Sequence, residues 1–316
     1  MNWAEDPIAA AHRAAIPWGG LSGPPRLIRN RENLVFEVHL AQGPHAALRL
    51  HREGYQSADA IRGELTWTAA LAGRGFPCPR PIPATSGDLA VRQPGLPMAS
   101  MITWIDAAPI GEHGQAFAGP VTRYKELGGL IARMHAITDN LDLGSLDRPS
   151  WDAEAILGED PHWGRFWENP SLSAEEVQFL LRARENAAQH LASLAAPDIG
   201  LIHADLLQEN ILENPEGISI IDFDDSGLGY RLYDLGTALI QHAEDPKLPD
   251  LSEALCAGYA AQKGLAENPV ALMPLFIMLR SMASCGWIML RAEADDPRQR
   301  VYAERALRCA RTYLES

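Results

Sequence analysis

The stretch that decides the fold of this chain reads Gly200-Leu-Ile-His203-Ala-Asp205-Leu-Leu-Gln-Glu-Asn210-Ile-Leu-Glu-Asn-Pro-Glu-Gly217-Ile-Ser-Ile-Ile-Asp222-Phe-Asp224-Asp225. Two apolar runs, at 211–212 and 218–221, flank a turn at 214–217, and this pattern predicts a short hairpin. The hairpin would return Asp222 to the side of Asn210, which follows Asp205 by five positions. We therefore expect three oxygen-bearing side chains to converge here.

The three residues suit phosphoryl transfer. A nucleotide's Mg²⁺ takes hard oxygen ligands, part of them from the phosphates, and Asn210 and Asp222 can supply the rest. Asp205 would then be free to orient an attacking hydroxyl and accept its proton. A single Asp or Asn beside a turn is more often a turn former. The interpretation therefore depends on all three residues at this spacing, which matches the catalytic loop of protein-kinase-like enzymes.

The flanking sequence predicts strands in front and helices behind. A hairpin is expected at 34–40 and 46–50, a helix at 58–72 capped by Ser57, an extended segment at 76–83 and a strand pair at 89–92 and 98–105. Apolar periodicity predicts helices at 124–136, 173–194, 252–262, 270–290 and 297–314. The fold class is therefore α+β, in two lobes: residues 1–103 with a small antiparallel sheet and residues 104–316 mainly helical.

Composition argues against several classes of partner, site and location. The 316 residues include 27 Lys+Arg and 41 Asp+Glu, a formal net charge of −14, which disfavours a nucleic-acid partner. The four cysteines form no CxxC pair, so we expect reduced thiols, no zinc site among them and a cytoplasmic location. The N-terminus lacks a secretory pattern. The apolar run 271–290 contains Pro274 and Arg280, which favours a buried helix over a membrane span.

These residues resemble a known family. His203 to Asn210, Ile221 to Asp225 and the Asp234 of Tyr-Asp-Leu are similar to the aminoglycoside phosphotransferase and type II homoserine kinase family, of the protein-kinase-like superfamily. The resemblance implies direct in-line transfer from ATP, with Asp205 as catalytic base and Asn210 and Asp222 on Mg²⁺.

It also implies supporting roles. His203 would hold the loop through hydrogen bonds, and Asp234 would brace it from the next helix. Asp225 would either face the acceptor and hold its ammonium group, or cap the turn at 226–227, and we weigh these two readings evenly.

The N-terminal part of the chain carries features that resemble the family's nucleotide-binding elements, in the same order along the sequence. Residues 32–38 resemble its nucleotide-covering hairpin, without a GxGxxG loop. Arg49 stands where the family has a phosphate-binding lysine, a departure that keeps the charge and changes the geometry. Glu64 would pair with that cation. The stretch Met101-Ile-Thr103-Trp104 would be the hinge whose backbone meets adenine.

The acceptor is not set by these motifs. The resemblance implies a hydroxyl on a small, amine-bearing metabolite of the homoserine, hydroxylysine, choline or aminoglycoside type, with no membrane or nucleic-acid partner. One alternative is a Ser/Thr protein kinase of the bacterial stress-response type. Another is a nucleotide-binding module that has lost catalysis. GTP in place of ATP, and the oligomeric state, stay open.

Overall fold

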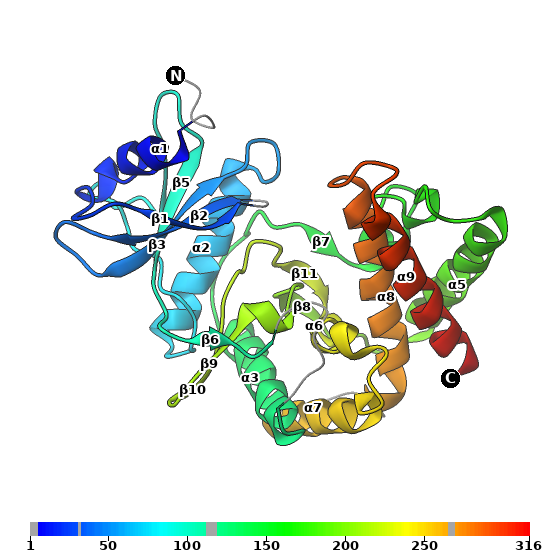
Figure 1. Ribbon diagram of the computed structural model, residues 1–316. Coiled ribbons are helices and arrows are strands. Elements are labelled where there is room, and N and C mark those ends of the chain that lie inside the picture. Colours follow the sequence, from blue (N-terminus) through cyan, green and yellow to red (C-terminus); the bar gives the residue numbers. More distant parts are fainter. Residues whose placement is uncertain (1–5, 31–32, 112–118, 265–268) are drawn as a thin grey trace. The chain divides into compact units, whose positions relative to one another are not determined.

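The chain forms two units, which are described one at a time. The computed structural model describes residues 6–30, 33–111, 119–264 and 269–316 (Figure 1). The first unit takes the chain up to Ala108, and two later segments, Leu141–Arg148 and Asn214–Asp224, return to it. The second unit comprises Pro109–Asn140, Pro149–Glu213 and Asp225–Ser316. Asp222 thus belongs to the first unit, whereas Asp205 and Asn210 belong to the second.

A five-stranded antiparallel sheet organises the first unit. Its order is β1 (Arg26–Asn30), β2 (Asn33–His39), β3 (His45–His51), β5 (Met98–Thr103) and β4 (Ala90–Arg92). The hairpin and the strand pair predicted from sequence are confirmed, and β1 is an addition to them. The alternation along β2 sends Phe36 and Val38 into the core and leaves Glu37 and His39 on the opposite face.

Helices cover the sheet. The short helix α1 (Pro7–Ala14) packs Ala11 and Ala14 into the same core as Phe36. Sequence analysis missed α1, although Asp6 and Pro7 are an N-cap and a first-turn proline. The helix predicted at 58–72 is α2 (Ala58–Gly73), and the Ser57 hydroxyl accepts the Ala60 N–H as its cap.

The second unit is mainly helical. Its helices are α3 (Thr122–Asp139), α4 (Ala153–Leu157), α5 (Ala174–Ser193), α6 (Arg231–Leu239), α7 (Leu248–Gln262), α8 (Pro269–Met289) and α9 (Pro297–Glu315). A small sheet joins β7 (Ser150–Trp151), β11 (Gly227–Tyr230) and β8 (Ile199–Ile202). The remaining strands are β6 (Ala108–Pro109), β9 (Ile211–Asn214) and β10 (Gly217–Ile220). β10 belongs to the segment that returns to the first unit, and β9 and β10 lie at the predicted positions.

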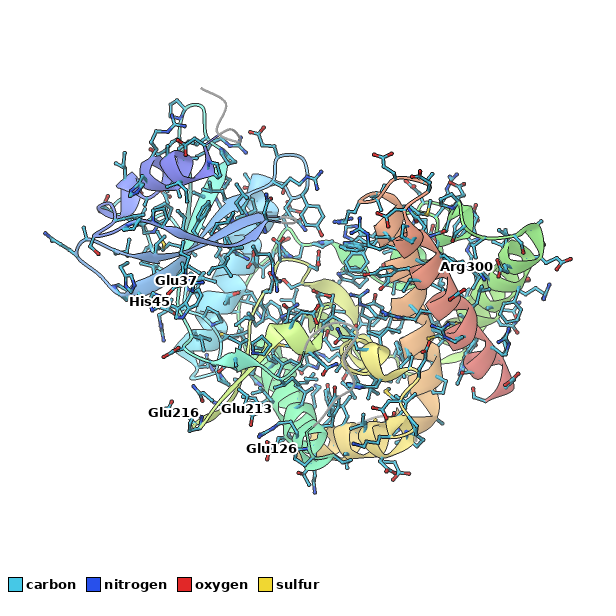
Figure 2. The ribbon with its side chains drawn as sticks, in the orientation of Figure 1. Glu37, His45, Glu126, Glu213, Glu216 and Arg300 are labelled. Atoms are coloured by element: carbon cyan, nitrogen blue, oxygen red, sulfur yellow. The ribbon has the colours of Figure 1, made fainter. Side chains whose placement is uncertain are left out.

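The first residues of two helices show how capping residues and proline set where a helix begins. The N-cap Ser173 and Glu176 form the predicted capping box of α5. Arg300 of α9, which is labelled in Figure 2, donates two hydrogen bonds of 2.9 Å to the Glu176 carboxylate. In contrast, α7 begins at Leu248, four residues before the predicted start. Pro249 lies in its first turn, where a missing N–H costs no intrahelical bond.

Helix α8 passes through the interior of the second unit. By length and composition it is apolar enough to cross a membrane, but most of its residues are buried inside the protein. Gly236 of α6 lies against it so closely that an added Cβ would come within 2.6 Å of the Phe276 backbone. The predicted buried helix is therefore confirmed.

Candidate active site

The loop after β8 is held by Asp234. This fully buried carboxylate accepts the N–H of His203 at 2.9 Å and the N–H of Ala204 at 2.7 Å. Ala204 has a φ of 66°, a conformation that costs energy in a residue with a Cβ. Nε2 of His135 lies 3.0 Å from Oδ2 of the same carboxylate. Asp234 thus bonds two successive N–H groups of a strained loop, and its bracing role in catalysis stays a prediction.

His203 forms a hydrogen bond within the same loop. Its ring is buried, and Nδ1 accepts the N–H of Asp205 at 3.3 Å. A ring that receives the backbone of the following turn fixes the direction in which Asp205 points. The structure thus gives His203 the position of a loop-holding residue.

Asp205 is engaged at both carboxylate oxygens. Oδ1 accepts a hydrogen bond from Nη2 of Arg280 at 2.7 Å, and Oδ2 accepts one from Nδ2 of Asn210 at 2.8 Å. The Asn210 Nδ2 also donates to the Asp205 carbonyl at 2.9 Å. The carboxylate is 19% exposed, so an acceptor molecule can still reach it.

Sequence analysis missed Arg280 as a site residue. It lies on α8, is 4% exposed and places its guanidinium 4.8 Å from the Trp163 ring. Burial alone would lower the pKa of Arg280, but Tyr233 and Asp205 outweigh it and raise that pKa. A signal was present, because an arginine inside the most apolar stretch of the chain needs a buried partner.

Asn210 offers an oxygen for a cation. Its Oδ1 is buried and has no hydrogen-bond partner among the described residues, while its Nδ2 is fully used by Asp205. An orphaned buried acceptor is costly unless a ligand completes it. A carboxamide oxygen is also the hard donor that Mg²⁺ prefers. This residue therefore fits the metal-binding role implied for it.

Asp222 is the other expected metal ligand, and it lies in the first unit. It also has a φ of 66°, and its carboxylate is 36% exposed with Oδ2 3.6 Å from Arg29. Phe223 anchors the turn by packing edge-on against Trp67. The convergence of Asp222 with Asp205 and Asn210 stays a prediction, because these residues belong to different units.

Arg49 and Glu64 form a buried ion pair in the first unit. Arg49 Nη2 lies 2.6 Å from Glu64 Oε1, and both side chains are 4% exposed. Burial would lower the pKa of Arg49, but the carboxylates of Glu64, Asp224 and Asp222 raise it. Arg49 Nε and Glu64 Oε2 have no partner within the described part of the chain. The expected cation–carboxylate pair exists; its contact with phosphate stays a prediction.

Asp224 joins this pair, although the sequence had left its role unsettled. It accepts the Asn33 side chain at 3.0 Å, and its other carboxylate oxygen has no hydrogen-bond partner among the described residues. Burial and the Glu64 carboxylate raise the pKa of Asp224 to about 7. The group is thus poised to lose a proton when a cation arrives.

Backbone groups of the expected hinge already form hydrogen bonds with another segment of the first unit. The Met101 carbonyl accepts the Ile82 N–H at 2.8 Å, and the Thr103 N–H donates to the Arg80 carbonyl at 2.8 Å. The extended segment 76–83 thus bonds to β5 at the residues named for adenine. Met101 and Thr103 stay predicted hinge residues, but the Thr103 N–H would first have to leave Arg80.

The Asp225 carboxylate lies close enough to Arg280 to affect its pKa, which it helps to raise. The Asp225 carbonyl accepts the Trp151 indole N–H at 2.8 Å. This places Asp225 in the second unit near the group that includes Asp205. The position is compatible with the substrate-facing reading of the two that the sequence left open.

Comparisons with known proteins show the family of this chain. A model of the phosphotransferase enzyme family matches residues 26–271. The homoserine kinase of Sinorhizobium medicae is 29% identical over 273 residues, 83% of this chain and 77% of that protein. The amicoumacin kinase of Bacillus subtilis is 24% identical over 291 residues, 86% of this chain and 82% of that protein.

A solved structure gives the same result for the fold. A microcompartment-associated aminopropanol kinase matches with a TM-score of 0.84 and 28% identity, covering 98% of each chain. The two-lobed protein-kinase-like fold expected from the sequence is confirmed by this likeness and by the sheet and helices described above. Since the family model covers most of the chain, the chain belongs to the phosphotransferase enzyme family, kinases that use a hydroxyl group as acceptor.

Proposed function

We propose that the enzyme transfers the γ-phosphoryl group of ATP, with Mg²⁺, to a hydroxyl of a small metabolite that carries an amine. The observation that carries this proposal is the environment of Asp205. Its carboxylate is accessible and is held from two sides, while the Asn210 oxygen beside it has no hydrogen-bond partner among the described residues. A base and a metal ligand side by side are what hydroxyl phosphorylation requires.

Each residue then has a defined task. Asp205 orients the acceptor hydroxyl and takes its proton as the oxygen attacks the γ-phosphorus, so no phosphoenzyme forms. Asn210 and Asp222 would hold the metal, which neutralises charge on the phosphate oxygens when bound. Arg49, kept in place by Glu64, would contact the phosphates through its remaining N–H groups.

An amine on the acceptor is supported by two observations. Two relatives are named homoserine kinase and aminopropanol kinase, and both names contain a substrate that combines a hydroxyl with an amine. In this chain, Asp225 supplies a second carboxylate near the group around Asp205. An ammonium group would balance that charge. We place the enzyme in the cytoplasm, in keeping with its free cysteines.

Transfer from γ-labelled ATP tests the proposal. The acceptor panel holds homoserine, amino alcohols, aminoglycosides, sugars and a protein mixture, with GTP as a second donor. We expect label on one amine-bearing small molecule, none with Asp205→Asn, and normal label with Asp295→Asn, a matched change at an exposed site. ATP should still bind to Asp205→Asn.

The other outcomes separate the alternatives. Label on polypeptide only would favour a protein kinase. ATP binding without transfer to any acceptor would favour a module that has lost catalysis. Turnover by Asp205→Asn close to that of the wild type would remove Asp205 from its role as base.

A further inference from the structure

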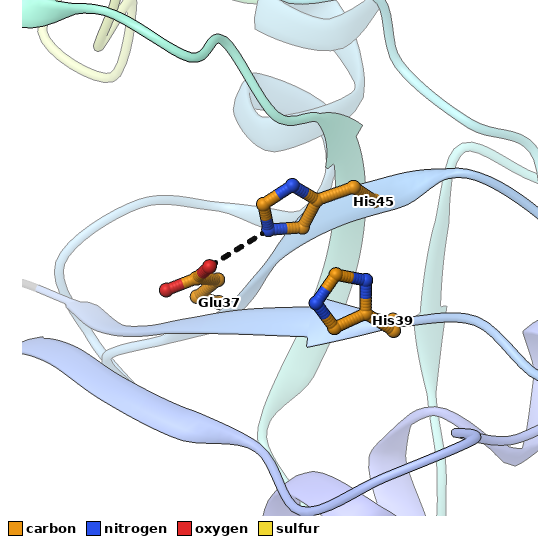
Figure 3. A group of neighbouring side chains, drawn as sticks. All are labelled: Glu37, His39 and His45. Carbon is orange, nitrogen blue, oxygen red and sulfur yellow. Dashed lines mark hydrogen bonds and ion pairs between the residues drawn. The ribbon is translucent and has the colours of Figure 1, made fainter.

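Three potential metal ligands meet on one face of the β2–β3 hairpin. His39 on β2 lies directly opposite His45 on β3, and Glu37 precedes His39 by two positions. Because alternate residues of a strand share a face, all three side chains project to the same side, as Figure 3 shows. One ligand atom from each lies within 4.8 Å of the other two.

The three side chains already contact one another. Nε2 of His45 lies 2.9 Å from Oε1 of Glu37, and the two imidazoles stack at 4.3 Å between ring centroids. His39 is exposed, whereas Glu37 and His45 are half-buried. The cluster is therefore open to solvent on one side and supported by the sheet on the other.

We propose that Glu37, His39 and His45 bind a transition-metal ion, with Zn²⁺ as the best fit. Two imidazoles and one carboxylate are the donor set of many three-ligand zinc sites, and a water completes the tetrahedron. Ligands at about 2.0–2.2 Å from zinc lie roughly 3.4 Å apart. To bind one ion, the two stacked imidazoles would have to turn apart so that a nitrogen of each points at it, and the exposed His39 side chain has room to turn.

Arg26 completes the arrangement. It forms an ion pair with Oε2 of Glu37. Oε1 of Glu37 faces His45, as Figure 3 shows. One carboxylate oxygen can thus ligate the ion while the other stays bonded to Arg26, the outer support typical of ligating carboxylates.

This site differs from the nucleotide's metal site in chemistry. Asn210 and Asp222 offer only oxygen, which suits Mg²⁺, whereas imidazole favours zinc and its neighbours in the transition series. The absence of cysteine from the cluster explains why the cysteine spacing gave no sign of it. Glu37 lies in the hairpin at 32–38 that resembles the family's nucleotide cover, but the proposal is argued from the donor set and geometry of the three residues and does not depend on the proposed function.

A bound ion would link the two strands near their shared turn. It would also act on Trp104, whose ring stacks on His45 at 5.0 Å between centroids. A paramagnetic ion such as Cu²⁺ or Ni²⁺ at this site would therefore quench the Trp104 fluorescence. Zinc would raise the melting temperature by binding the folded state alone.

Calorimetry with ZnCl₂ tests the proposal on the full chain, freed of metal with EDTA and held in excess Mg²⁺ to fill oxygen-only sites. We expect one saturable site in the wild type. Removing a ligand, in His39→Ala or His45→Ala, should weaken binding at least about 10- to 100-fold. His12→Ala, an exposed histidine of α1 outside the cluster, is the matched control and should bind as the wild type does.

The decisive variant is His39→Ala, because its exposed side chain contributes little to folding. Zinc should raise the melting temperature of the wild type and of His12→Ala, and leave that of His39→Ala unchanged. Absence of saturable zinc binding to the wild type, or equal affinity in His39→Ala and His12→Ala, would overturn the proposal.

Discussion

At the scale of the residue, the site depends on how Asp205 is held. A carboxylate that must meet a hydroxyl has to point in one direction, and Arg280 and Asn210 each fix one of its oxygens. Small displacements of a reacting group cost catalysis steeply. Arg280 touches Asp205 and is itself enclosed by Trp163, so we regard it as a positioning residue.

Replacement of Arg280 tests this role. Arg280→Met should lower kcat about 100-fold with little change in KM for ATP, because Asp205 loses its orientation while the nucleotide groups are untouched. Arg280→Lys keeps the charge but loses the planar contact with Trp163, and it should retain more activity. Steady-state kinetics on samples with wild-type circular dichroism measure the effect. A kcat within twofold of wild type in Arg280→Met would contradict it.

The residue scale also shows what a sequence can predict. Asp205 and Asn210 lie five positions apart, so their contact follows from one local loop. Arg280 reaches Asp205 across 75 positions, and only tertiary packing brings α8 to the loop. Arg49 and Glu64 are an intermediate case, because their pairing needed the family's register and not spacing alone. The cluster of Glu37, His39 and His45 was missed because the predicted strands 34–40 and 46–50 leave out His45, which the folded register sets opposite His39.

At the scale of the element, glycine sets how closely two helices pack. An added Cβ at Gly258 of α7 would lie 1.9 Å from the Lys125 carbonyl of α3, and one at Gly128 would lie 2.0 Å from the Leu255 carbonyl. The helices thus approach through two glycines that face the partner backbone. Neither the periodicity of α3 nor that of α7 revealed this, since both patterns predict helices and not their spacing.

A pair of glycine variants tests the contact between α3 and α7. Gly258→Ala should destabilise the protein by about 3 kcal/mol, because backbone cannot move aside as a side chain can. Gly129→Ala is the matched control: its Cβ would meet its nearest neighbour at 3.6 Å, so the higher helix propensity of alanine should add up to about 1 kcal/mol. Urea unfolding measures both, and a loss of equal size in the two variants would refute the close approach.

The end of α6 contains a titratable element. His242, in the 3₁₀ turn η4 (Ile240–His242), is buried and hydrogen-bonded to the Tyr124 hydroxyl of α3. Burial lowers the pKa of His242 from 6.5 to about 4, although Asp245 opposes the shift. Between these values the unfolded chain binds the proton and the folded chain does not. The contribution of neutral His242 to the free energy of unfolding is therefore complete above pH 6.5 and is lost as the pH falls toward 4.

His242→Asn should flatten that pH dependence. Each pKa unit corresponds to about 1.4 kcal/mol, so the loss of stability between pH 7.5 and pH 4.5 should be smaller in the variant by up to about 3 kcal/mol. The variant itself is less stable at pH 7.5, because it loses the contact with Tyr124. Urea unfolding at the two pH values gives the comparison. An identical loss in wild type and variant would show that His242 does not titrate in this window.

At the scale of the whole molecule, the negative net charge affects how fast charged substrates reach the protein. The net charge of −14 attracts cations over a distance set by the ionic strength. The Debye length falls from about 30 Å at 0.01 M to about 8 Å at 0.15 M, so added salt removes this attraction. An amine-bearing acceptor and the anionic nucleotide should therefore respond to salt in opposite directions.

This response separates a charged acceptor from a neutral one. With a saturating nucleotide, kcat/KM for an amine-bearing acceptor should fall several-fold between 0.01 and 0.15 M salt, because steered encounter slows as the field is screened. A deaminated analogue of the same acceptor should show no such fall. With a saturating acceptor, kcat/KM for ATP should rise, because screening weakens its repulsion from an acidic surface. If both acceptors respond alike, the net charge does not select the amine, and recognition must then come from contacts such as those available at Asp225.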